Sequence, residues 1–223
     1  MCGRFALGIP RKRLQERFEL GDVPQAPARY NIAPSQLVEA VVQTSQGGRF
    51  LKLLKWGLVP FWVKDKPIGN KMINARSETV ATNGAFKGPI RYRRCLIPAQ
   101  GFYEWATENG KRQPWFITSR NSEVLALAGI WDTFESRGAG EVIESMAIIT
   151  SSANELVAPL HDRMPVIVEP EDYARWLDPD LTDPDQVMDI LASRPWLDMQ
   201  AYRVGSQVNS PKNEDPALIE PLI

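Results

Sequence analysis

The feature that most constrains the fold of this chain is a series of short apolar runs, each about as long as one β-strand. They cover residues 37–43, 50–56, 93–97, 102–106, 114–118, 124–131 and 146–150. Asn109-Gly110 lies between two of these runs and predicts a type I′ hairpin turn, in which both central residues take positive φ angles. The runs do not alternate with helices in the βαβ manner, so we do not expect a doubly wound fold.

Helical patterns are few and lie between or after the strand runs. Leu14 and Phe18 have helical spacing and predict a first helix within 11–20, and further helices are expected at 77–86, 169–177 and 184–192. At 223 residues with 43% hydrophobic residues, the chain can bury the core of one domain. We therefore expect an α+β fold, a single domain over residues 1–223 with a curled, largely antiparallel β-sheet (a pseudo-barrel) flanked by short helices.

Composition excludes several classes of protein. A formal net charge of −1 excludes a protein that holds nucleic acid by bulk basicity, although a local basic groove remains compatible with it. The apolar runs are far too short for a membrane span, and two cysteines cannot form a disulfide framework, so we expect a cytoplasmic protein without a membrane partner. With one histidine and no glycine-rich phosphate loop, no metal or other cofactor is expected.

The amino terminus, Met1-Cys2-Gly3-Arg4-Phe5, places one cysteine directly after the initiator position. Methionine aminopeptidases remove Met1 when the second residue is small, so we expect Cys2 to become the first residue. Such a cysteine carries an amine and a thiol on adjacent carbons, with ordinary pKa values of about 8 and about 8.5. The amine can condense with an aldehyde, and the thiolate can then close a thiazolidine on the same carbon. The alternative is that position 2 simply tolerates a small residue.

Two ionisable residues could transfer protons. Glu104 in "GFYEW" would share a strand face with Phe102 among large apolar neighbours, and desolvation there would raise its pKa toward neutrality. The alternative is an edge-strand carboxylate that faces water. His161, the single histidine, lies between two prolines in "PLHDRMP" and would titrate near neutrality. A structural histidine is the alternative there.

Other motifs offer groups for an oxygen-rich ligand. In "INARSE", Asn74 and Arg76 would lie on one face of an extended segment, where an amide beside a guanidinium suits sugar and phosphate. Pro34 in "YNIAPS" and Trp62 in "WGLVPFW" lie beside predicted turns, where they could stack on bases or separate them, or simply belong to the core. Cys95 has the pattern of a buried strand cysteine, and we assign it no role.

Together these motifs resemble the SRAP family, the SOS response-associated peptidases, also called abasic-site processing proteins. The resemblance rests on "MCGRF", "YNIAPSQ", "WGLVPFW", "INARSET", "GFYEW", "PLHDRMP" and "VNSPKNEDPALIEP". These follow one another in the family's order from Cys2 to the last few residues. Any one motif would be weak evidence, but the ordered set is specific.

The resemblance implies binding of single-stranded DNA at an abasic site and a thiazolidine crosslink between the amino-terminal cysteine and the sugar aldehyde. Cys2 matches the nucleophile, Asn74 the residue that orients it, and Glu104 the acid–base residue of ring opening and imine formation. His161 matches the second proton-transfer and sugar-binding residue. The DNA contacts carried over are the phosphate ligands Arg4, Arg76 and Arg163 and the base-separating residues Pro34 and Trp62. Local insertions near Trp62 weaken its match.

The expected partner is therefore single-stranded DNA containing abasic sites, bound by a monomer that associates with the nucleoid when it acts, with replication-fork proteins as further partners. Three alternatives remain open. Cys2 could serve an amino-terminal-nucleophile amidohydrolase that attacks glutamine. It could serve a thiol peptidase with His161 and Glu104, including removal of a leader. The chain could also be a non-enzymatic single-strand binding module, in which replacing Cys2 would change nothing.

Overall fold

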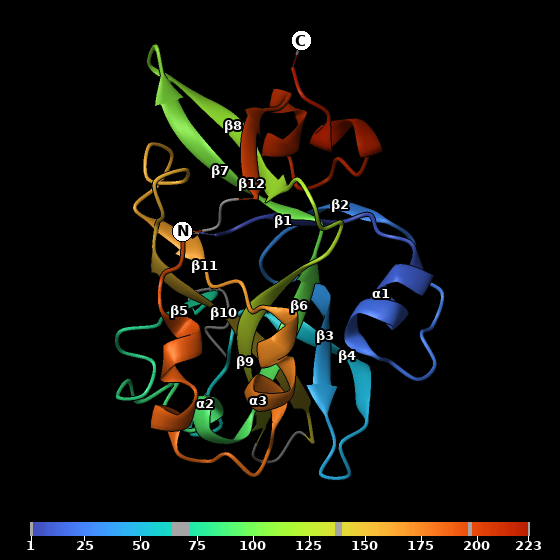
Figure 1. The fold of residues 1–223 in the computed structure, drawn as a ribbon, viewed down its shortest axis with the longest axis vertical. Helices are drawn as coiled ribbons and strands as arrows, with labels where there is room; N and C mark the ends of the chain where they lie inside the picture. The colour runs from blue at the N-terminus through green and yellow to red at the C-terminus, as the bar shows by residue number, and fades with distance from the viewer. Residues whose placement is uncertain (1, 64–71, 137–139, 196–197, 223) are drawn as a thin grey trace.

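The computed structural model of the protein describes residues 2–63, 72–136, 140–195 and 198–222. Its strands form two sheets, one above the other in the view of Figure 1. The upper sheet has five strands in the order β12-β8-β7-β1-β2. Their bounds are β1 Phe5–Leu7, β2 Arg29–Ile32, β7 Gly101–Glu108, β8 Lys111–Ser119 and β12 Met199–Arg203.

The second sheet curls on itself. Its pairings run from β10 through β4, β3, β6 and β9 and back to β10, while β5 and β11 also pair with β10. The bounds are β3 Leu37–Gln43, β4 Arg49–Trp56, β5 Asn74–Arg76, β6 Arg94–Ala99, β9 Leu125–Glu135, β10 Val142–Ser152 and β11 Arg163–Pro165. Among the described pairings, β10 runs parallel to β4 and β5, and the others are antiparallel. The predicted curled, mainly antiparallel α+β fold is confirmed.

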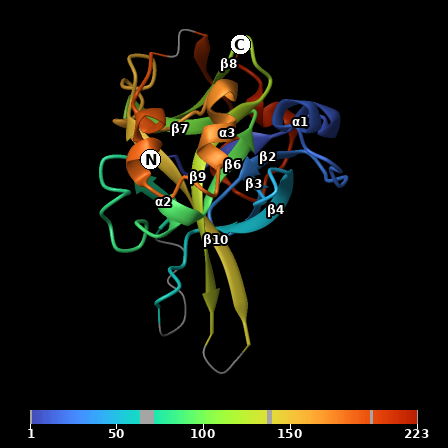
Figure 2. The same cartoon turned by 60° about the horizontal axis from the view of Figure 1, so that its bottom comes forward.

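Helices are short and lie at the edges of the sheets. The α-helices are α1 Arg11–Phe18, α2 Pro89–Tyr92 and α3 Tyr173–Leu177. Single 3₁₀ turns cover Pro170–Asp172, Pro184–Gln186, Met188–Leu191, Ser206–Asn209 and Pro216–Ile219. Figure 2 shows the long β9–β10 hairpin projecting from the body of the molecule. No helix among the described residues is long and apolar enough to span a membrane.

The predictions of the first helix and of the Asn109-Gly110 turn are confirmed. Leu14 and Phe18 of α1 are both fully buried, as their spacing predicts. Asn109 and Gly110 have φ angles of 49° and 76°, so the predicted positive-φ turn joins β7 to β8. Such a turn matches the right-handed twist of the two strands that it connects.

Two helix predictions are wrong. Segment 77–86 forms successive turns instead of a helix, because β-branched residues, Asn83 and Gly84 all disfavour the α conformation. The Asn83 side chain accepts a hydrogen bond from the Ala85 N–H at 2.9 Å, which competes with helix formation. Segment 184–192 forms two 3₁₀ turns instead of one helix.

The two sheets share a core that fixes the position of the amino terminus. Phe5 of β1 and Trp56 of β4 are both buried, with ring centroids 5.3 Å apart. The Trp56 indole N–H donates to the Ile73 carbonyl at 2.9 Å, just before β5. Residues 2–4 lead into β1, so this packing holds them against both sheets.

Candidate active site

The residues before β1 run beside β7. Phe5 pairs with Phe102 and Ala6 with Gly101, and the Tyr103 N–H donates to the Arg4 carbonyl at 2.9 Å. Continuing this antiparallel register places Gly3 opposite Glu104. The amino-terminal segment therefore reaches Glu104 by strand pairing, although about a hundred residues separate them in the sequence.

Cys2 is fully buried, with 0% exposure. Its carbonyl accepts a hydrogen bond from Asn74 Nδ2 at 2.9 Å. Asn74 begins β5 and is held by parallel pairing with Ile148 of β10. Burial, and then the negative charge of Glu104, raise the pKa of the Cys2 thiol well above its ordinary value, so the thiol is neutral in this position.

The amide of Asn74 has an unused acceptor. Its Oδ1 is buried and makes no hydrogen bond to any residue that the structure describes. A buried amide oxygen without a donor is costly, commonly by about 1–3 kcal/mol. The Asn74 amide thus donates to Cys2 through Nδ2, and its Oδ1 can accept a hydrogen bond from a bound group.

Glu104 is a buried carboxyl, with 3% exposure. Burial raises its pKa to about 7, and nearby Arg112 opposes that rise. At neutral pH both protonation states are populated, so the group can give or take a proton. The predicted alternation along "GFYEW" is present, since Phe102 belongs to the large core and Tyr103 to a smaller core beneath the carboxy-terminal segment.

His161 reaches the same place from the turn before β11. The Arg163 N–H lies 3.0 Å from His161 Nδ1 and donates to it in the tautomer that carries its proton on Nε2. An Asp162 carboxylate oxygen lies 2.7 Å from the same Nδ1 and can accept from it once the ring is protonated. Burial lowers the pKa of His161, which favours the neutral form at pH 7.

Glu104 and His161 line one pocket of about 390 Å³, and Cys2 and Asn74 lie next to it without being among its lining residues. Its lining residues are Gly3, Arg4, Glu104, Trp105, Arg112, His161 and Asn209. Both Arg4 and Arg112 place a guanidinium 5.7 Å from the centre of the Trp105 ring. A carboxyl and an imidazole therefore share a pocket with two cations beside the residue that follows Cys2.

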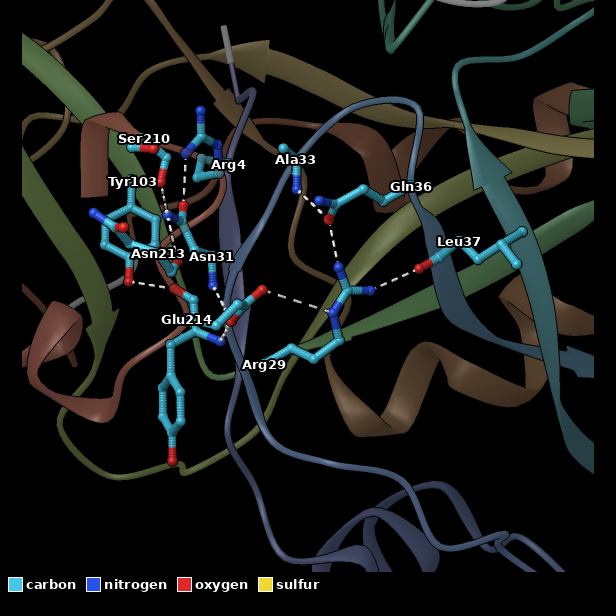
Figure 3. Close-up of polar contacts among 11 residues, drawn as sticks. Arg4, Arg29, Asn31, Ala33, Gln36, Leu37, Tyr103, Ser210, Asn213 and Glu214 are labelled. Atoms are coloured by element: carbon cyan, nitrogen blue, oxygen red, sulfur yellow. Dashed lines mark hydrogen bonds and ion pairs between the residues drawn. The ribbon is translucent and has the colours of Figure 1, made fainter. Parts of the chain in front are cut away.

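Arg4 is fixed by a buried network. Its Nη1 donates to Asn31 Oδ1 at 2.6 Å (Figure 3) and also to the Val208 carbonyl at 2.8 Å. Asn31 is fully buried, and its Nδ2 donates to the carbonyls of Val208, Ser210 and Asn213. The carboxy-terminal segment thereby holds Arg4 in place where it lines the pocket.

Glu214 completes this network. It accepts from the backbone N–H groups of Tyr30 and Asn31 at 2.7 and 3.2 Å, and its other oxygen lies 3.8 Å from Arg29 (Figure 3). Sequence reasoning missed the roles of Asn31, Asn209, Glu214 and Arg112 in and around the pocket. For the first three, the motifs "YNIAPSQ" and "VNSPKNEDPALIEP" were the available signal.

The other predicted DNA contacts lie at different distances from the pocket. Arg163 forms a two-pronged ion pair with Glu78, at 2.6 and 2.9 Å, and its side chain is 12% exposed. Arg76 is exposed on β5 beside Thr150 of β10. Pro34 is half-buried in the turn after β2, and Trp62 lines a different cavity with Phe61, so neither lines the Glu104 pocket.

Comparison with known proteins decides the family. The family model described as SOS response associated peptidase (SRAP) matches residues 1–211. This chain belongs to the SRAP family. It is 41% identical to the abasic site processing protein YoqW of Bacillus subtilis, over 99% of both chains, and 33% identical to YedK of Escherichia coli, over 100% of both.

Solved structures of other proteins share this fold. A crystal structure of a protein from Bacteroides thetaiotaomicron has a TM-score of 0.87 with 24% identity over 100% of both chains, which supports the fold. A phage-related protein from Bordetella bronchiseptica has a TM-score of 0.72 with 30% identity, over 91% of this chain and 94% of that one. Within the described ranges of this SRAP protein, no group of three His, Cys, Asp or Glu side chains is arranged to hold a metal ion.

Proposed function

We propose that this SRAP protein processes abasic sites in single-stranded DNA by crosslinking itself to them through Cys2, exposed by removal of Met1. The observation that carries the proposal is the shared pocket of Glu104 and His161 beside Gly3, the residue that follows Cys2. Relatives described as abasic site processing proteins support the choice of lesion. The crosslink would shield the DNA strand from cleavage during the response to DNA damage.

The reaction balances without a cofactor. The ring-closed sugar of an abasic site must open to its aldehyde, which needs a proton moved to the ring oxygen. The Cys2 amine adds to the aldehyde carbon, and loss of one water gives an imine. The Cys2 sulfur then adds to the same carbon while its proton passes to the imine nitrogen, so the product contains protein and DNA less one water.

Glu104 suits these proton transfers. With a pKa raised by burial to about 7, it can protonate the leaving oxygen and afterwards accept a proton from the amine or thiol. A buried thiol with a raised pKa stays protonated, so Cys2 needs such a base. Burial favours the neutral form of His161, and its Nε2–H tautomer would supply a second donor to the sugar oxygens.

The Cys2 thiol would protect the DNA strand from cleavage. An imine alone acidifies the neighbouring hydrogens of the sugar and favours elimination of the 3′ phosphate, which cuts the strand. Closing the thiazolidine removes the imine. On this account the amine captures the lesion, and the thiol prevents the cleavage that the amine would otherwise promote.

The cations around the pocket suit the flanking phosphates. Arg4 is preorganised by Asn31 and Val208, and Arg76 is exposed at the end of β5. A phosphate could bind Arg163 by replacing the carboxylate of Glu78, which is half exposed. Such local contacts do not require a high net charge, because single-stranded binding needs only a few phosphate contacts.

The test compares strand protection by Cys2→Ser and Cys95→Ala variants on an oligonucleotide with one abasic site. Cys95 is the other buried cysteine and provides a matched control. The Cys95→Ala protein should crosslink and protect the strand, whereas the Cys2→Ser protein should lose the stable adduct and still cut part of the DNA. An uncut abasic strand with Cys2→Ser would count against the protective role of the thiol. Release of ammonia from glutamine, or peptide cleavage, in place of crosslinking would favour the hydrolase alternatives.

A further inference from the structure

A second cavity of the molecule is separate from the Glu104 pocket. It measures about 1240 Å³ and lies between residues 61–62, the segment 81–93 that includes α2, and the end of β9. We propose that this groove binds the DNA strand that flanks the lesion, with Tyr92 and Phe61 as stacking platforms and Lys87 and Arg91 as phosphate ligands. The inference rests on the proposed function and adds a binding site to it.

Solvent-exposed aromatic side chains line the groove. Phe61 is 65% exposed and Tyr92 is 61% exposed, although most large apolar side chains of this protein are buried. Trp62, at 53%, lies beside them. Exposed rings grouped in a cavity mark a binding surface, and every nucleic-acid base has a face that can stack on them.

The positive charge of the groove favours DNA over an uncharged or basic ligand. Lys87 and Arg91 are exposed, and neither forms an ion pair with another described residue. Arg93 is already paired with Asp132, and Glu135 is the acidic residue among those that line the cavity. The available charge is therefore positive beside open rings, which complements a strand of phosphates and bases.

The groove lies within reach of a strand bound at Cys2. Asn74, which contacts Cys2, is paired with Ile148 of β10. Three residues earlier, Ser145 pairs with Asp132, whose carboxylate accepts from the Phe61 N–H at 3.1 Å. β5 and β9 pair with opposite edges of β10. Three strand residues span about 10 Å along β10 and two strand spacings add about 10 Å across it, so Asn74 and Asp132 lie about 14 Å apart.

A stacked nucleic-acid strand advances about 3.4 Å per nucleotide, so the groove begins about four nucleotides from the lesion. The chain itself connects the two places, since β5 continues through residues 77–88 into α2 (Figure 1). Arg76 is exposed at the start of that connection. A DNA strand leaving the Glu104 pocket along this side would meet cations before it reached the groove.

The experiment measures equilibrium binding of oligonucleotides that carry a tetrahydrofuran analogue of the abasic site, which has no aldehyde and cannot crosslink. The strand is lengthened one nucleotide at a time on either the 5′ or the 3′ side. The proteins compared are the unmodified chain, Tyr92→Ala, the double variant Lys87→Gln with Arg91→Gln, and Arg120→Gln as control. Arg120 is an exposed arginine that does not line the groove.

We expect affinity to rise roughly 5- to 100-fold on one side only, once the strand extends about four nucleotides past the lesion. Tyr92→Ala should remove most of this rise, and the double variant should lower the slope of log affinity against log salt by about 0.7 for each lost phosphate contact. Arg120→Gln should behave like the unmodified protein. Equal crosslinking of a short strand with a true abasic site would show that all variants remain folded.

Identical length dependence in all proteins would overturn the groove proposal while leaving the crosslinking function intact. The same holds if short and long strands bind equally, in which case the rings and cations serve a protein partner instead. Failure of the unmodified protein to bind or crosslink any abasic strand would overturn the proposed function itself. The two failures are therefore distinguishable.

Discussion

Replacing Glu104 by glutamine should make the protein more stable at alkaline pH. The carboxyl is 3% exposed, and its burial raises the pKa from 4.5 to about 7. The folded state therefore binds this proton more tightly than the unfolded chain does. Between these two pKa values the folded protein holds more protons, so the free energy of unfolding falls as the pH rises.

The size of the effect follows from the two pKa values. Each pKa unit corresponds to about 1.36 kcal/mol, so a shift from 4.5 to about 7 costs the folded protein about 3 kcal/mol once Glu104 is ionised. The cost is absent below the unfolded pKa and complete above the folded one. Glutamine has a similar shape and carries no charge, so Glu104→Gln removes the cost without a large change in packing.

The assay is chemical denaturation of the unmodified protein and the Glu104→Gln variant at a series of pH values. The difference in their free energies of unfolding should increase in favour of the variant by about 3 kcal/mol between about pH 5 and pH 8. Glu155→Gln, which replaces an exposed carboxyl, should show no such increase. A constant difference for Glu104→Gln over this range would refute the interpretation of Glu104 as a carboxyl with a pKa near neutrality.

Three further predictions concern the site and its supports. His161→Gln should slow single-turnover crosslinking by roughly a hundred- to ten-thousandfold without lowering the melting temperature, and unchanged kinetics would exclude proton transfer by His161. Asn31→Leu should lower the free energy of unfolding by at least about 3 kcal/mol in denaturant titrations, because it leaves Arg4 and buried carbonyls without partners. Arg4→Gln should then lower the free energy of unfolding less in the Asn31→Leu variant than in the unmodified protein. Gly101→Ala should cost about 1–3 kcal/mol in the same titration, because its Cβ would lie 2.6 Å from the Ile117 carbonyl oxygen, whereas Gly84→Ala meets no atom within 4 Å and should be neutral.

Strands and turns could be predicted because their signals are local. Residues 37–43 match β3 at both ends, and Asn109-Gly110 forms the expected hairpin turn. The helix predicted at 77–86 failed because its weak apolar spacing could not overcome β-branched residues, an Asn side-chain bond and a glycine. Turn chemistry outweighs weak periodicity in this segment.

The grouping of the site residues could not be predicted from local pattern. Cys2, Asn74 and Glu104 meet because β1 pairs with β7 and β5 pairs with β10, and such registers depend on the whole sheet. The family resemblance, which rests on ordered motifs, supplied this grouping instead. Glu104 was expected among large apolar neighbours, and its burial agrees with that reasoning.

The hydrogen bonds from Asn31 to the carboxy-terminal segment could not be predicted from the sequence for a different reason. Asn31 donates to three backbone carbonyls, of Val208, Ser210 and Asn213, and backbone acceptors leave no side-chain signature. The large groove was missed because Phe61 and Tyr92 look like core residues in the sequence. Only their exposure in the fold shows that they form a surface.

Intact-protein mass spectrometry tests the central claim most directly, before and after incubation with a single-stranded oligonucleotide that carries one abasic site. We expect a protein that lacks Met1 and a heat-stable adduct whose mass equals protein plus DNA less one water. A protein that retains Met1, or one that forms no adduct while the abasic DNA stays intact, would contradict the claim. Cys2 would then be only a small residue after the initiator methionine.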